Sequence, residues 1–333
     1  MLSLSSYIRL LTGALWLGVI GQVMGGETTP SHLDDVSPSR ILRAGGWEVE
    51  VMHPTHLDRY NTGVRFTPIA AVLQVRNGET EFCFRPVAHE ELFDHAGLCS
   101  EFDPTGLPPG FSEAKIGEGF VKVGVGVLKK SKSAYGFFRQ YEVIERAVTT
   151  VKWSAAGATF SQACGGINGY SYRLEATVRL EPKGELWIDW ALTNTGEKAL
   201  STSTYNHNFF QFFEPPQTLG YELHFPYPVQ AGGDIQNLRI EKNSLGFLKP
   251  LEKPINVAVP YPEKHTGDNT VELRWPATGQ RVVCAVSRPG TKLLLHAAPS
   301  YVCPEQFIHI KIEPGATETW TWRYEFHLPE AKN

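Results

Sequence analysis

The chain has 333 residues, a formal net charge of −4 at neutral pH and no long basic run, which argues against nucleic acid as a partner. Aromatic residues make up 11% of it, beside 31 glycines and 23 prolines, a composition rich in strand formers and turns. The length allows one large domain or two small ones, since all-β domains often exceed about 200 residues.

Residues 1–25 have the pattern of a secretory signal peptide. Arg9 precedes an apolar run over residues 10–21, and Val23-Met24-Gly25 offers a small-residue cleavage site. The run is too short for a comfortable membrane span. We therefore predict a periplasmic or secreted protein with no membrane span after cleavage, with an uncleaved anchor as the alternative. Residues 26–40 are polar and predict a linker.

The cysteines and the early histidines give little sign of a metal site. His53 and His56 precede Asp58 in a loop-like segment, where chance clustering competes with metal binding. An odd number of cysteines leaves at least one thiol without an intramolecular partner, and no pair has the spacing of a structural zinc site. We expect neither a metal nor a cofactor. The five cysteines are Cys83, Cys99, Cys164, Cys284 and Cys303.

Strand signals begin at residues 47–51, and Asn77-Gly78 between two apolar runs predicts a hairpin. Residues 89–118 lack periodicity, and a loop of this length inside a compact domain is usually functional or disordered. Its aromatic and apolar content favours an ordered loop at an active site. His89, His95 and Glu101 are secondary candidates there, with a surface position as the alternative for each.

Regular alternation continues along the second half of the chain. Residues 170–180 and 186–192 alternate apolar and polar side chains, as strands with one buried face do. Residues 307–313 and 319–326 flank a Pro314-Gly315 turn and predict a last hairpin, with Trp320 and Trp322 on one face. Many short strands and no convincing long helix predict a sandwich or barrel. We therefore expect a single domain over residues 41–328.

The strand that ends near residue 208 carries the first candidate site residue. Tyr205, His207 and Phe209 share one face of this strand. An imidazole between aromatic rings on a sheet surface is typical of a sugar site, because rings stack on the apolar face of a pyranose. A buried histidine with a satisfied hydrogen bond is the alternative.

Three segments resemble the aldose 1-epimerase (galactose mutarotase-like) superfamily, nearest to its hexose-6-phosphate epimerase-like branch. They are YGFFRQYEVIE from Tyr135, STYNHNFFQF around His207, and YVCPEQ before the Pro314-Gly315 turn. The resemblance spans roughly residues 40–328, and the segments follow one another in the family's order. It implies a large antiparallel β-supersandwich with a carbohydrate cleft.

By position, the resemblance implies that His207 protonates the ring oxygen and that Glu305 is the base for the anomeric hydroxyl. It also implies that Arg139 binds the substrate. Tyr135 stands where the family has a histidine, and Pro304 before the base is unusual. Tyr135, Tyr205 and Glu101 complete the expected substrate-binding set, and no cofactor or metal is implied.

Three functions follow as hypotheses. The first is an exported, monomeric, aldose 1-epimerase-like isomerase acting on a small sugar or oligosaccharide. It requires His207 and Glu305 to face each other within about a sugar's width. The second is a carbohydrate-binding sandwich without the acid/base pair. The third, a polysaccharide lyase-like enzyme or a hydrolase subunit, requires a longer open groove and a Tyr/His pair.

Overall fold

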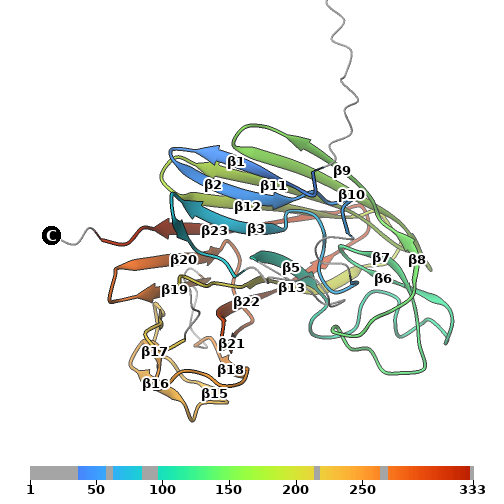
Figure 1. Ribbon diagram of the computed structural model, residues 1–333. Coiled ribbons are helices and arrows are strands. Elements are labelled where there is room, and N and C mark those ends of the chain that lie inside the picture. Colours follow the sequence, from blue (N-terminus) through green and yellow to red (C-terminus); the bar gives the residue numbers. More distant parts are fainter. Residues whose placement is uncertain (1–36, 58–62, 85–96, 214–217, 263–268, 331–333) are drawn as a thin grey trace, which may run out of the picture. The chain divides into compact units, whose positions relative to one another are not determined.

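The computed structural model describes residues 37–57, 63–84, 97–213, 218–262 and 269–330 (Figure 1). These residues belong to one compact unit that begins at Ser37. They contain no helix, and every strand pairing among them is antiparallel. The predicted signal peptide and residues 26–36 of the predicted linker lie outside the described residues.

The first large sheet has the strand order β1-β2-β3-β5-β13-β22-β21-β18-β15, with β4 paired to β3. Its strands are β1 (Ser39–Ala44), β2 (Trp47–Met52), β3 (Val72–Asn77), β4 (Thr80–Glu81), β5 (Leu98–Phe102), β13 (Leu200–Asn208), β15 (Gly232–Gly233), β18 (Ile255–Val259), β21 (Lys292–Ala298) and β22 (Tyr301–Ile312).

The second large sheet has the order β16-β17-β14-β19-β20-β23-β12-β11-β10-β9. Its strands are β9 (Val148–Trp153), β10 (Gly157–Ile167), β11 (Tyr170–Glu181), β12 (Glu185–Asn194), β14 (Glu222–His224), β16 (Leu238–Glu241), β17 (Ser244–Phe247), β19 (Asn269–Trp275), β20 (Gln280–Val286) and β23 (Thr317–His327). A small third sheet holds β6 (Gly119–Lys122), β7 (Gly126–Lys129) and β8 (Val143–Arg146).

The two large sheets pack against each other through aromatic side chains. Phe102 of β5 lies edge-on to Trp190 of β12 and Trp320 of β23, at ring-centroid distances of 6.1 and 6.2 Å. Trp190 and Trp320 stack at 5.9 Å within their own sheet. Such ring pairs add about 0.5–1.5 kcal/mol each beyond the area that they bury. The alternation predicted for residues 170–180, 186–192 and 319–326 is confirmed, because each strand buries every second side chain.

The hairpin at Asn77-Gly78 is confirmed, with Asn77 opposite Thr80 and Gly78 at a φ of 56°. The last predicted hairpin is wrong. β22 pairs with β13 and β21, whereas β23 pairs with β12 and β20, so the Pro314-Gly315 turn carries the chain from one sheet to the other. Local alternation shows which face of a strand is buried, but it does not show which strands are its neighbours.

The linker prediction is wrong at its end. β1 begins at Ser39, which pairs with Met52, so Ser39 and Arg40 already belong to the sheet. Their polar side chains do not show the alternation of a half-buried strand, because β1 lies at the edge of its sheet and buries only one of its six residues.

Candidate active site

The site lies on the first large sheet, where β5, β13, β22 and β21 are consecutive neighbours. The two faces of β13 have different surroundings. Asn206 donates a hydrogen bond to the Tyr324 hydroxyl at 2.7 Å, and that hydroxyl donates one to the Asn208 side-chain oxygen at 2.8 Å. Tyr324 belongs to the facing sheet, so these asparagines point into the core. Tyr205 and His207 alternate with them and therefore point to the opposite face.

That face carries a cavity of about 290 Å³. Its wall is formed by side chains from four strands (β13, β18, β21 and β22) and three connecting segments: Arg65, Pro104, Thr105, Phe137, Phe138, Tyr205, His207, Asn256, Lys292, Leu294, His296, Tyr301, Glu305 and Phe307. Small-molecule sites usually range from about 300 to 1,000 Å³, so this cavity suits a ligand of monosaccharide size. A larger groove of about 830 Å³ lies over β2, β3 and β4, but no histidine lines it.

His207 and Glu305 meet inside the cavity. The His207 Nε2 atom lies 3.1 Å from the Glu305 Oε1 atom, and both side chains are buried. A hydrogen bond of this length holds one proton between the two atoms. Burial raises the pKa of Glu305 well above its ordinary value, against the opposing effect of the Arg65 cation. The His207 ring stacks on Phe209 at a centroid distance of 3.7 Å, which fixes its plane.

Arg65, Glu101 and Tyr205 form a second polar group beside this pair. Arg65 Nε donates to Glu101 Oε2 at 2.9 Å, its Nη2 donates to the Tyr205 hydroxyl at 3.1 Å, and that hydroxyl donates to Glu101 Oε2 at 2.6 Å. The guanidinium lies against the rings of Phe66 and Phe137. Burial opposes its charge, but Tyr205 and Glu101 together raise the pKa of Arg65, so it remains a cation. Glu101 is fully buried behind the wall and holds the two lining residues in place.

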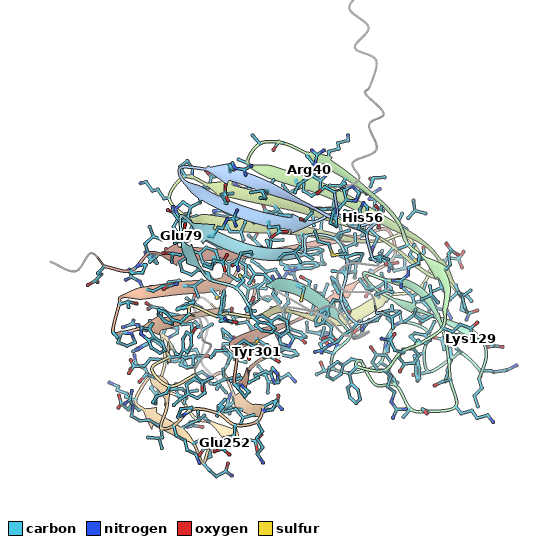
Figure 2. All side chains as sticks on the ribbon, in the orientation of Figure 1. Arg40, His56, Glu79, Lys129, Glu252 and Tyr301 are labelled. Atoms are coloured by element: carbon cyan, nitrogen blue, oxygen red, sulfur yellow. The ribbon has the colours of Figure 1, made fainter. Side chains whose placement is uncertain are left out.

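Two further strands complete the wall. His296 of β21 lies 5.6 Å from His207 between ring centroids, and its Nδ1 is 3.0 Å from the Asn256 side-chain oxygen of β18. Burial lowers the pKa of His296 to about 4, so it is neutral near pH 7. Its Nε2 is 3.4 Å from the hydroxyl of Tyr301, which is labelled in Figure 2. Lys292 places its ammonium 4.2 Å from the Phe307 ring centroid.

Two residues that the sequence resemblance implied do not line the cavity. Tyr135 accepts a hydrogen bond from Lys122 Nζ at 2.9 Å and donates one to the backbone carbonyl of Asp103 at 3.1 Å. Arg139 is exposed and contributes nothing to the wall. Phe137 and Phe138, from the same segment between β7 and β8, do line the cavity. The middle of this segment therefore faces the cavity, whereas Tyr135 and Arg139 on either side of it do not.

Sequence reasoning missed Arg65, Lys292 and His296. Lys292, Leu294 and His296 share one face of β21, and Leu294 lies opposite Glu305. The period-2 alternation would have placed both polar residues together, but not beside Glu305. Arg65 comes from a loop, and the bridge between Phe66 and Glu101 holds that loop against the sheet.

Neither a metal site nor a membrane helix is found in the ranges given above. No group of three or more histidine, cysteine or carboxylate side chains there could hold a metal ion, and no helix there could cross a membrane. His53 and His56 have ring centroids 5.1 Å apart. Asp58, His89 and His95 lie outside the described residues, as does the apolar run of residues 10–21.

The arrangement supplies the groups for acid/base chemistry. A carboxyl and an imidazole in contact are side-chain types that serve as acid and base toward a bound ligand. Arg65 offers a fixed cation, Tyr301 and His296 offer neutral hydrogen-bonding groups, and Phe137, Phe138 and Phe307 offer apolar faces. These are the groups that a polyhydroxylated ring requires.

Solved structures share this architecture. A galactose mutarotase related enzyme from Lactobacillus acidophilus superposes with a TM-score of 0.56 at 11% identity, covering 88% of this chain and 99% of its own. A putative aldose 1-epimerase from Escherichia coli K12 gives 0.55 at 14% identity, covering 87% and 99%. Galactose 1-epimerase from Lactobacillus acidophilus NCFM gives 0.52 at 11% identity, covering 88% and 95%.

The fold is therefore the all-β galactose mutarotase-like sandwich predicted from the sequence. No family model matches the chain, and no curated protein matches it.

Proposed function

We propose that this protein is an aldose 1-epimerase-like enzyme that interconverts the anomers of a small sugar. The hydrogen-bonded His207–Glu305 pair inside a cavity of monosaccharide size is the observation that carries the proposal. The galactose mutarotase-like fold supports it, because the structural neighbours named above include a putative aldose 1-epimerase and a galactose 1-epimerase.

The reaction requires one base and one acid near the anomeric carbon. In the form with the shared proton on His207, the Glu305 carboxylate takes the proton of the anomeric hydroxyl while His207 gives its proton to the ring oxygen. The bond from C1 to the ring oxygen then breaks and the C1 carbonyl forms. Rotation about C1–C2 and the reverse proton transfers close the ring on the other face, so atoms and protons balance over the cycle.

The two groups are closer than the width of a sugar, which changes the expected binding mode. At 3.1 Å they leave no room for a ring between them. The anomeric hydroxyl and the ring oxygen are both bonded to C1, so one edge of the sugar can reach neighbouring acid and base groups. We infer that the sugar binds with this edge against the pair and its hydroxyls toward Arg65 and His296.

A lyase-like function fits the cavity less well. The Tyr205 hydroxyl already bonds Glu101 and Arg65, and burial raises its pKa well above the ordinary value, so it is a poor proton donor or base. The cavity is also too small for a polymer groove. A sandwich that only binds sugar would share the aromatic wall but would not need the acid/base pair, so the His207–Glu305 contact favours the enzyme, and the activity assay decides between them.

Anomer exchange measured by NMR on freshly dissolved α-aldoses tests the proposal. The panel contains glucose and galactose together with carboxylated and phosphorylated aldoses, because the preferred sugar is a separate question. We expect the wild type to accelerate exchange for at least one of them. His207→Ala should lower the rate by about 100-fold or more, whereas His309→Ala, an exposed histidine on the same strand as Glu305, should not. If the wild type accelerates none, the proposed function is wrong.

A further inference from the structure

Among the described residues that line the cavity, the charged side chains are paired with one exception. The Arg65 guanidinium is neutralised by Glu101 at 2.9 Å, and the Glu305 carboxyl shares a proton with His207. Lys292 has no carboxylate within ion-pair distance among the residues that the structure describes, and its ammonium lies over the Phe307 ring. Burial lowers the pKa of Lys292, while the more distant Glu305 opposes this effect. A half-buried cation without a counter-ion is costly unless a ligand supplies the charge.

The position of Lys292 matches the far end of a small sugar. Leu294 lies opposite Glu305 in the strand register, and Lys292 is the next residue on the same face of β21. Two residues along a strand span roughly 7 Å, which is on the scale of one pyranose ring. A sugar whose anomeric edge contacts Glu305 therefore brings a substituent on its opposite side to the Lys292 ammonium.

We propose that the sugar is a monoanion, a hexuronate whose carboxylate binds Lys292. This inference rests on the proposed function and names its substrate class. One unpaired cation matches one negative charge. A phosphate carries about −1.5 to −2 at neutral pH, which exceeds what Lys292 alone balances, since Arg65 is already occupied by Glu101. If Lys292 instead serves only to offset the charge of Glu305, the enzyme should show no preference for acidic sugars.

The test compares anomer exchange for glucose, galactose, glucuronate, galacturonate and glucose 6-phosphate. We expect at least one hexuronate to exceed its matching neutral hexose by about tenfold in kcat/KM. Lys292→Met should reduce this ratio about tenfold or more, mainly through KM, because one charged hydrogen bond is lost. Lys292→Arg should retain most of the preference, and Lys311→Met, an exposed lysine on β22, should leave it unchanged.

Three outcomes would overturn the inference while leaving the proposed function intact: equal rates for neutral and acidic sugars, a preference unchanged in Lys292→Met, or a greater preference for the phosphate. If the wild type accelerates no sugar, calorimetry of hexuronate binding decides the inference separately. Hexuronate binding that Lys292→Met weakens supports it, and absent or unchanged binding refutes it.

Discussion

Glu305→Gln separates a catalytic carboxyl from a structural one. Glutamine has nearly the same shape and can still form a hydrogen bond with His207 Nε2, but it cannot take a proton from a sugar. A positioned general base contributes about 10²- to 10⁴-fold in rate, which is about 3–5 kcal/mol of barrier. We expect kcat to fall by that factor while substrate binding changes little.

The stability of the same variant should move in the opposite direction. The folded-state pKa of Glu305 is raised because burial disfavours its charge, so the native state binds more protons than the unfolded chain above about pH 4.5. Wild-type stability therefore falls as the pH rises from 4.5 toward the folded-state pKa, by about 1.4 kcal/mol for each unit crossed. The neutral amide removes this dependence, so Glu305→Gln should be at least as stable as the wild type at pH 8.

Urea unfolding at pH 5 and pH 8, with anomer exchange measured by NMR on the same samples, checks both expectations. An inactive variant that is equally or more stable at pH 8 identifies Glu305 as a group retained for chemistry. Full activity, or a loss of several kcal/mol at pH 8, would show that the carboxyl serves the fold and would refute the assigned role.

Two further predictions concern the surroundings of the pair. Arg65→Met should lower kcat/KM by about 100-fold or more, since it removes a buried cation from the cavity wall and leaves Glu101 without its ion pair. Arg139→Met changes an exposed residue and should alter kcat/KM by no more than about twofold. A larger loss in Arg139→Met than in Arg65→Met would instead support the substrate-binding role that the sequence resemblance implied for Arg139. Asp103 is buried, and burial raises its pKa from 3.8 to about 6, so native stability falls by about 3 kcal/mol as the pH rises through that range. Asp103→Asn, which tolerates the local φ of 54°, should abolish this dependence in urea unfolding between pH 4 and pH 7, and an unchanged slope would contradict it.

The contact between His207 and Glu305 shows how much of the site can be predicted from local sequence patterns. Each residue was identified within its own strand, and resemblance to a known family supplied the expectation that the two meet. The face on which His207 lies follows from alternation, because Asn206 and Asn208 take the core side. That the two side chains touch depends on β13 and β22 being neighbours, a pairing between segments about a hundred residues apart in the chain.

The sequence by itself determined the all-β class, the buried faces of β11, β12 and β23, and the strand that carries His207. Each of these follows from the alternation of apolar and polar residues within a single segment. Only the tertiary structure decided that β22 and β23 enter different sheets, that Arg65 rather than Arg139 lines the cavity, and that Lys292 and His296 line the same wall. These features depend on which distant strands become neighbours. Burial of the whole apolar surface selects that pairing, and no single segment contains it.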